Sequence, residues 1–227
     1  MKKLLLILIA LPMIGFGQNV NIPDANFKAY LVGNSAINTN GDGEIQLIEA
    51  NAFNGQIACS YLNISDLTGI EYFTALTNLY CPNNNLNTLD VSNNLALTYL
   101  YCLNNQLIIL DLSTNLALTN LDCSNNQLTS LDVSNNLGLT YLDCSYNQLT
   151  SLDVSNNLGL TYLDCSYNQL TTLDVSSNLA LNQLSCVENL LTSLDVSNNL
   201  ALTTLYCSIN QLTSLDVRNG YNTNITS

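Results

Sequence analysis

The stretch LTYLDCSYNQLTSLDVSNNLG, residues 139–159, is followed directly by LTYLDCSYNQLTTLDVSSNLA, residues 160–180. Cysteine marks the same period elsewhere, because seven cysteines from Cys81 to Cys207 lie 21 residues apart and Cys59 lies 22 residues before Cys81. A fixed period of this length indicates one supersecondary unit stacked on copies of itself. The sequence therefore predicts a repeat solenoid, in which any function is carried by columns of exposed residues.

Each unit reads L-x-x-L-x-C-x-x-N-x-L-x-x-L-D-V-S-x-N-x-A/G. The alternation in Leu142 and Cys144, and again in the L-D-V triplet, is typical of short strands with one buried face. Two such strands in each coil predict a flattened cross-section with little helix. Eight cysteines in an exported chain often form disulfides. Here the cysteines take inward strand positions, so we expect free core thiols that act as small hydrophobic residues.

Asparagine recurs three residues after the cysteine and three residues after the valine of each unit. A corner of the coil leaves buried backbone groups, and an asparagine amide can both donate and accept hydrogen bonds there. We expect each asparagine to bond the backbone of its own coil and of an adjacent one. The first column is Asn84, Asn105, Asn126, Asn147, Asn168, Asn189 and Asn210, and the second is Asn94, Asn115, Asn136, Asn157, Asn178 and Asn199.

The repeat resembles the leucine-rich repeat, L-x-x-L-x-L-x-x-N/C-x-L, and more narrowly the bacterial 21-residue class with nested halves. The resemblance is close from Leu76 to Val217. The first coil, IACSYLNISDLTGIEYFTA from Ile57, is more similar to the 22-residue repeats of internalin-like surface proteins. The resemblance implies a right-handed coil of short parallel β-strands that binds ligands on its concave strand face. It does not identify the ligand, since this fold serves many.

The chain begins with Lys2 and Lys3, followed by an apolar run from Leu4 to Phe16 and the small residue Gly17. The run is too short to span a bilayer and is typical of a secretory signal peptide. We therefore expect a secreted or cell-surface protein without membrane insertion. Similar proteins continue into further modules and a C-terminal sorting domain of the type IX secretion system, so a truncated C-terminus stays open.

The segment between the signal peptide and the first coil differs from the repeat. Asp24 is expected to cap a short helix with Phe27, Tyr30 and Leu31 on one face, which would cover the open end of the solenoid. The predicted organisation is a signal peptide over 1–17, a helical cap over 18–56, a solenoid of eight coils over 57–217 and a tail over 218–227.

The cap contains NTNGDGEIQLIE, residues 38–49, which matches the EF-hand loop D-x-[DN]-x-[DN]-G-x5-E except at its first position. The pattern predicts Ca²⁺ held by the side chains of Asn38, Asn40 and Asp42, the backbone carbonyl of Glu44 and the carboxylate of Glu49. Only two of these side chains are charged ligands, so we expect weak binding. The alternative is an N-G-D-G turn without a metal.

Two exposed columns on the predicted concave face combine tyrosine with aspartate. Tyrosine offers a flat apolar ring and a hydroxyl at low entropic cost, which suits protein contacts and stacking on sugars. The alternative is that these residue types simply suit an exposed strand. The predicted ligand-binding residues are Tyr99, Tyr101, Asp122, Tyr141, Asp143, Tyr162 and Asp164.

Two further columns leave alternatives open. Aspartates of the L-D-V triplets, from Asp90 to Asp216, would repel one another in a stack. They are balanced either by hydrogen bonds from the backbone and the serine two residues later, or by bound cations. The leucines from Leu95 to Leu200 that precede the A/G position either enter the core, which we prefer, or form an exposed apolar ridge.

The composition argues against two classes of function, nucleic-acid binding and catalysis. The chain has four basic and 17 acidic residues and a net charge of −13, which disfavours nucleic acid as a partner. There is no histidine, and the acids occur in periodic columns rather than as one asymmetric pair, so we expect no enzyme. The sequence predicts protein binding or adhesion through the strand face. A carbohydrate-binding module or a structural spacer of a larger exported protein is the alternative, and the oligomeric state is not predicted.

Overall fold

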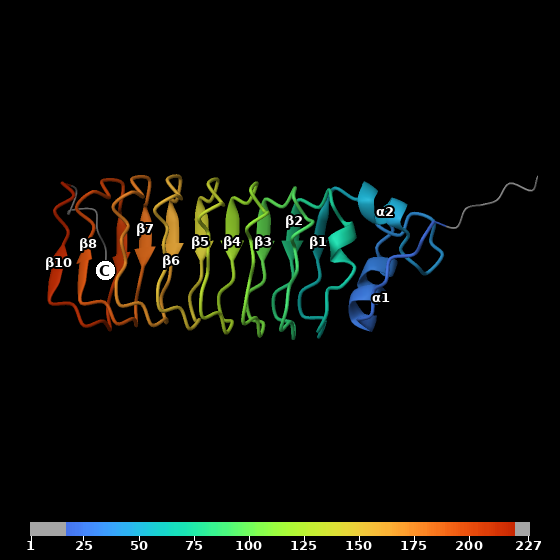
Figure 1. Ribbon diagram of the computed structural model, residues 1–227, viewed down its shortest axis with the longest axis horizontal. Helices are drawn as coiled ribbons and strands as arrows, with labels where there is room; N and C mark the ends of the chain where they lie inside the picture. Colours follow the sequence, from blue (N-terminus) through green and yellow to red (C-terminus); the bar gives the residue numbers. More distant parts are fainter. Residues whose placement is uncertain (1–16, 221–227) are drawn as a thin grey trace, which may run out of the picture.

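The computed structural model describes residues 17–220, so the predicted signal peptide lies almost entirely outside the described residues. The described chain forms a row of stacked coils, here called rungs, that runs from two helices at one end to β10 at the other (Figure 1). The elements are α1 (Ala25–Gly33), α2 (Leu47–Ala52), β1 (Gln56–Ala58), the 3-10 helix η1 (Ile70–Tyr72), β2 (Asn78–Tyr80), β3 (Tyr99–Tyr101), β4 (Asn120–Asp122), β5 (Tyr141–Asp143), β6 (Tyr162–Asp164), β7 (Gln183–Ser185), β8 (Ser193–Asp195), β9 (Thr204–Tyr206) and β10 (Ser214–Asp216).

One strand from each rung joins a parallel eight-stranded sheet in the order β1-β2-β3-β4-β5-β6-β7-β9. The register is constant from β2 onward. Leu121, for example, is the register partner of Leu100 on one side and of Leu142 on the other. Equivalent residues one repeat apart are therefore stacked, which confirms the predicted solenoid of short parallel strands with little helix. The second half of each repeat, here called the back face, forms a sheet in the described residues only where β8 pairs with β10.

The core is a continuous stack of leucine, valine and cysteine side chains. The cysteines from Cys59 to Cys186 are fully buried free thiols, while Cys207 in the last rung is partly exposed. Burial raises the pKa of the Cys59 and Cys186 thiols to about 12, so these groups are protonated and unreactive at neutral pH. The inward position predicted for cysteine is confirmed.

The first asparagine column holds each corner to its neighbour as expected. The amide nitrogen of Asn126 donates to the carbonyl of Cys123 in its own rung at 3.0 Å and to that of Cys102 in the preceding rung at 3.1 Å. Its amide oxygen accepts the backbone N–H of Leu107 at 3.0 Å. One side chain thus satisfies buried backbone groups on two rungs, which ties adjacent rungs together.

The second column satisfies only carbonyl groups. The amide nitrogen of Asn136 donates to the carbonyls of Leu112 at 3.2 Å and Asn115 at 2.9 Å in the preceding rung. The amide oxygens of this column are buried and have no hydrogen-bond partner. An unpaired buried acceptor loses its hydration without compensation, so these residues stabilise the fold less than the first column does.

The preferred core position of the leucine column is wrong. Leu95, Leu116, Leu137, Leu158, Leu179 and Leu200 are 58% to 64% exposed. The residue before each leucine is an asparagine of the second column, which is buried, and the leucine two residues later is also buried, as Asn136 and Leu139 illustrate. Because these neighbours occupy the inward positions of the turn, the leucine between them points to solvent.

The helical cap covers the first rung. Asp24 accepts the N–H groups of Asn26 and Phe27 at 2.9 Å each, as an N-cap residue does, and its second oxygen accepts the Ser65 N–H at 2.8 Å. Phe27 and Leu31 are fully buried. These contacts place the apolar face of α1 on the end of the core.

The cap also protects the outer edge of the sheet. The backbone N–H of Ala58 in β1 donates to the hydroxyl of Tyr30 at 2.8 Å. β1 is the first strand of the sheet, and an open strand edge invites pairing with another chain. Tyr30 therefore satisfies a donor that no strand reaches. The helices among residues 17–220 are too short or too polar to span a bilayer.

Candidate functional site: the tyrosine–aspartate sheet face

The structure brings all seven predicted ligand-binding residues onto the exposed side of strands β3 to β6, here called the sheet face. Tyr99, Tyr141 and Tyr162 belong to one column, with Asn120 between the first two. The second column consists of Tyr101, Asp122, Asp143 and Asp164, and each member is the register partner of the next.

The tyrosines of the sheet face contact one another along and across the strands. The rings of Tyr141 and Tyr162 are stacked, with centroids 4.4 Å apart and an angle of 6° between the planes. Tyr101 lies edge-on to Tyr99, with centroids 6.5 Å apart, and its centroid is 6.4 Å from that of Tyr141. Such pairs are worth about 0.5–1.5 kcal/mol each beyond the burial of area, so the rings are held in place before any ligand arrives.

The aspartates of the sheet face are partly buried. Asp143 Oδ1 accepts the hydroxyl of Ser145 at 2.7 Å and its backbone N–H at 3.0 Å, and Asp122 makes the same pair of bonds with Ser124. Burial raises the pKa of Asp143 to about 6, with a further contribution from the neighbouring carboxylates Asp122 and Asp164, although the bonds from Ser145 lower it. Burial likewise raises the pKa of Asp122.

No basic residue of the described chain compensates these carboxylates. Among residues 17–220 the basic side chains are Lys28, which pairs with Glu44 at 2.7 Å, and Arg218, which pairs with Asp216. A partly desolvated carboxylate is more stable beside a cation than beside other carboxylates. A positively charged group of a binding partner would therefore stabilise the carboxylates of the sheet face.

Sequence reasoning missed a second tyrosine pair next to this face. Tyr146 and Tyr167 occupy the corner after β5 and β6, and their rings are stacked with centroids 4.0 Å apart and 9° between the planes. Both residues have positive φ, 52° and 55°. The column that contains them holds Tyr61 in the first rung and Asn83 in the second, both with positive φ, and the change from asparagine at Asn125 to tyrosine at Tyr146 is the signal that could have identified the pair.

The predicted calcium loop is organised by hydrogen bonds of its own. The side-chain oxygen Oδ1 of Asn38 accepts the Gly41 N–H, that of Asn40 accepts the Asp42 N–H, and that of Asp42 accepts the Glu44 N–H, at 2.9 to 3.0 Å. Side-chain oxygens at alternate positions therefore hold the backbone of the loop through short-range hydrogen bonds. Val20 N–H donates to Ile45 O at 2.8 Å and pairs the loop with the N-terminal segment.

The carboxylates of the loop already have donors. Glu49 Oε1 accepts the N–H groups of Thr39 at 2.7 Å and Asn40 at 3.2 Å, and Oε2 accepts the Gln46 N–H at 3.0 Å. The amide of Gln46 donates to both oxygens of Asp42, at 3.2 and 3.1 Å. Carboxylate and amide oxygens are the ligands that Ca²⁺ prefers, so the donor set fits the ion in kind. A bound ion would have to replace some of these hydrogen bonds, which limits its affinity.

The back face carries the second aspartate column. Oδ1 of Asp90, Asp132 and Asp174 accepts the backbone N–H of the serine two residues later at 2.9 Å in each case. These serine bonds hold the pKa of each of the three carboxyl groups below its ordinary value. The hydrogen bonds predicted for this column are therefore present, whereas cation binding along it stays a prediction.

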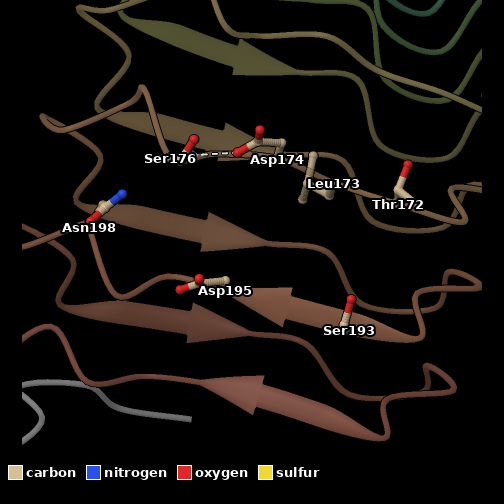
Figure 2. Close-up of a pocket in the computed structure, with 7 residues that line it drawn as sticks. All are labelled: Thr172, Leu173, Asp174, Ser176, Ser193, Asp195 and Asn198. Carbon is tan, nitrogen blue, oxygen red and sulfur yellow. Dashed lines mark hydrogen bonds between the residues drawn. The ribbon is translucent and has the colours of Figure 1, made fainter.

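Two shallow grooves lie on the back face. One has a volume of about 350 Å³ and includes Asp174 and Asp195 from adjacent rungs. Figure 2 shows these side chains with the bond from Ser176 to Asp174. The other groove, of about 700 Å³, lies over the first rungs and is lined in part by the exposed Ile108 and Ile109. Within residues 17–220, no three histidine, cysteine, aspartate or glutamate side chains are grouped closely enough to hold a metal ion.

Comparison with known proteins connects this geometry to solved structures. The chain is similar to internalin C2 from Listeria monocytogenes, with 20% identity over 92% of this chain and 95% of that one and a TM-score of 0.69. A leucine-rich-repeat protein from Leptospira interrogans is 22% identical over 79% of this chain and 55% of that one, with a TM-score of 0.64. Neither a protein-family model nor a curated protein matches the chain.

The chain therefore has the leucine-rich-repeat solenoid fold. The functional domain of InlJ from Listeria monocytogenes is 31% identical over 88% of this chain, with a TM-score of 0.40. The chain spans 61% of that domain and 55% of the Leptospira protein. The likenesses to internalin C2 and to the Leptospira protein establish the fold, and the function has to be argued from the columns described above.

Proposed function

We propose that the protein is an exported leucine-rich-repeat protein that binds a protein partner, in recognition or adhesion, through the sheet face. The observation that carries this proposal is the alignment of Tyr99, Tyr101, Tyr141 and Tyr162 with three partly buried aspartates on adjacent strands. The predicted signal peptide supports export to the outside of the cell or to its surface. Binding, rather than catalysis, is the proposed activity.

The chemistry of the face suits a protein interface. Tyrosine is enriched among the residues that dominate binding energy, because its large ring buries much area while losing few rotamers. Here the Tyr141–Tyr162 stack already restricts both rings, so less entropy is lost on binding. The adjacent carboxylates add charge-assisted hydrogen bonds that select a partner with basic or donor groups.

The direct test is binding to arrays of extracellular proteins and of glycans. We expect protein hits whose affinity falls at least tenfold in the double variant Tyr141→Ala, Tyr162→Ala, because truncating central aromatic residues commonly costs about 2 kcal/mol or more. The matched control is Asp132→Ala, Asp153→Ala on the back face, which should keep the affinity of the native protein. Equal loss in both variants, or no loss in the tyrosine variant, contradicts the proposal.

A glycan ligand is the alternative that the glycan array addresses. The observation in its favour is the stacked pair Tyr146 and Tyr167, of which Tyr146 is 51% exposed at the edge of the sheet face. Flat aromatic surfaces of this kind bind the apolar faces of sugar rings. Glycan hits that depend on Tyr146 and protein arrays without hits would favour a carbohydrate-binding module. The absence of hits in both arrays would favour a structural spacer.

We also propose that the loop of residues 38–49 binds Ca²⁺ weakly. The supporting observation is that the side-chain oxygens of Asn38, Asn40 and Asp42 each accept a backbone N–H of the loop, while the Glu49 carboxylate accepts the Thr39 N–H and closes it. Because the ion competes with existing hydrogen bonds, we expect a dissociation constant on the order of 10⁻⁴ to 10⁻³ M.

Thermal unfolding in millimolar calcium and in chelator tests this site. Calcium should raise the melting temperature of the native protein and leave that of Asp42→Asn unchanged. A melting temperature that is the same with calcium and with chelator would rule the ion out. A calcium response that survives in Asp42→Asn would place the ion elsewhere, with the back-face aspartates as the candidates.

A further inference from the structure

Six leucines form a straight apolar row along one corner of the solenoid, here called the leucine edge. Each lies in the turn that leads from the back face into the next strand of the sheet, and each is more than half exposed. The members of the leucine edge are Leu95, Leu116, Leu137, Leu158, Leu179 and Leu200.

The leucines of this edge gain little from one another. Leu95 and Leu200 at the ends of the row are 59% and 58% exposed, while Leu137 in the middle is 64% exposed. All six side chains stay more than half exposed although equivalent residues stand one repeat apart, so stacking within the row covers less than half of each side chain. Contacts within the chain therefore do not account for the choice of leucine at this position.

The edge is also more uniform than other exposed columns. The column that begins at Tyr61 reads Tyr, Asn, Asn, Asn, Tyr, Tyr, Glu and Ile in successive rungs. The exposed aspartates of the back face are constant, but their bonds to the following serine explain that constancy. Leucine is constant through six rungs with no such bond. Thr74 holds the equivalent place in the first rung, where its hydroxyl donates to Asn51 Oδ1 at 3.5 Å, and shows that a polar side chain fits this turn.

The edge is free of charge on a strongly acidic molecule. The five residues around each leucine, such as residues 134–138 and 155–159, contain no charged side chain, whereas the whole chain carries a net charge of −13. Two copies of an acidic protein repel each other over most of their surfaces. The leucine edge is a surface at which two copies can approach without bringing carboxylates together.

We propose that the leucine edge is the interface between two copies of this chain. A row of identical residues is self-complementary, as the isologous interface of a two-fold dimer requires. Transfer energies of leucine correspond to roughly 100 Å² of apolar area per side chain, so the exposed parts of six leucines amount to roughly 350 Å² on each copy. With the flanking polar and small residues, the interface reaches the lower size limit of specific complexes, about 1,000 Å² in total.

An interface of this size makes a weak dimer, with a dissociation constant in the micromolar range. The dimer leaves the sheet faces of both copies exposed, because the edge lies in the turns before the strands rather than on them. Two copies held edge to edge would present two tyrosine–aspartate faces to one partner surface. The inference does not depend on the sheet face being the ligand site.

Sedimentation velocity of the protein from about 1 to 300 µM tests the dimer, since this range brackets micromolar association. The native protein should shift from monomer to dimer. The variant Leu137→Thr, Leu158→Thr should dissociate at least tenfold more readily, and threonine preserves the turn as Thr74 does. The matched control is Ile108→Thr, Ile109→Thr, which removes two exposed apolar side chains away from the edge, where other rungs carry threonine and serine.

The control variant should associate as the native protein does, and circular dichroism should show the same fold in all three proteins. A native protein that stays monomeric throughout this range overturns the proposal. Equal weakening in the control variant also overturns it, because association would then follow total exposed apolar area rather than the edge. Neither result bears on ligand binding, which the tyrosine variants test separately.

Discussion

At the scale of single residues, backbone conformation and side-chain identity disagree at one column. Asn83, Asn125 and Ile209 have φ of 56°, 50° and 54° in equivalent places of their rungs. Asparagine tolerates this left-handed conformation, whereas a β-branched residue is strained in it. The strain at Ile209 is not offset by burial, because the side chain is 67% exposed.

We therefore expect Ile209→Asn to stabilise the protein by about 1 kcal/mol. The reverse change, Asn83→Ile, should destabilise it by a similar or larger amount. The free energies of unfolding from urea titration provide the measurement. If Ile209→Asn were destabilising, backbone strain would not be the dominant energy at this column.

The two asparagine columns are predicted to differ in their contribution to stability. Asn147 makes four hydrogen bonds, three from its amide nitrogen and one to its oxygen, which accepts Leu128 N–H at 2.9 Å. Asn157 makes two, and its oxygen is unpaired. Because both substitutions to alanine leave a similar cavity, the difference between them isolates the hydrogen bonds.

Asn147→Ala should cost about 4 kcal/mol and Asn157→Ala about 2 kcal/mol, counting roughly 1 kcal/mol for each bond. Chemical denaturation of the two variants beside the native protein gives both values. Equal costs would mean that the corner bonds of the first column do not hold adjacent rungs together. A larger cost at Asn157 would indicate that its oxygen has a buried water as partner.

At the scale of elements, the row of carboxylates across β4, β5 and β6 should make stability depend on pH. The pKa of Asp143 is about 6 in the folded protein and about 3.9 in an unfolded chain. The folded state therefore binds the proton more tightly. The stabilisation from this group is complete below about pH 4 and is lost as the pH rises through 6.

Asp143→Asn should consequently increase stability at pH 7.5, by on the order of 2 kcal/mol, and weaken the pH dependence between pH 4 and 7. Asp153→Asn is the control, because bonds from Ser155 lower the pKa of that exposed carboxyl group. It should not stabilise the protein at neutral pH. Unfolding curves at pH 5 and 7.5 test both variants, and unchanged stability of Asp143→Asn at pH 7.5 would show that the carboxylate is well solvated.

The elements also show what a repeat sequence can and cannot predict. The period identifies which residues are equivalent. The burial of Cys144 follows from its inward place in the alternating strand, and that of Asn147 follows because buried backbone groups at the corner need hydrogen-bond partners. The facing of Leu137 was predicted wrongly, since the period does not state which turn residue points inward. The pair Tyr146 and Tyr167 was missed because its contact depends on the left-handed conformation of the corner.

The back face shows the same limit. The L-D-V triplets alternate as strands do, yet within the described residues only those of β8 and β10 are paired. Alternation identifies the buried side of an extended segment, but pairing also requires neighbouring backbones at strand distance. The bonds from the Ser176 backbone N–H to the Asp174 carboxylate, and their equivalents, follow from the D-x-S spacing and are present in both paired and unpaired rungs.

At the scale of the whole molecule, every functional column depends on rungs that are stacked in register. The reactivity of the cysteine thiols tests this stacking without the need for a ligand. Burial raises the pKa of each thiol from Cys81 to Cys165, so these groups are neutral as well as inaccessible. Cys207 in the last rung is partly exposed and differs from them.

Alkylation of the native protein, followed residue by residue with mass spectrometry, tests the stacked register most directly. Cys207 should react first, and Cys123 and Cys144 should react only as fast as the protein unfolds. Rapid and equal modification of Cys123, Cys144 and Cys207 in the folded protein would contradict the stacked register, and with it the assignment of the sheet face and the leucine edge.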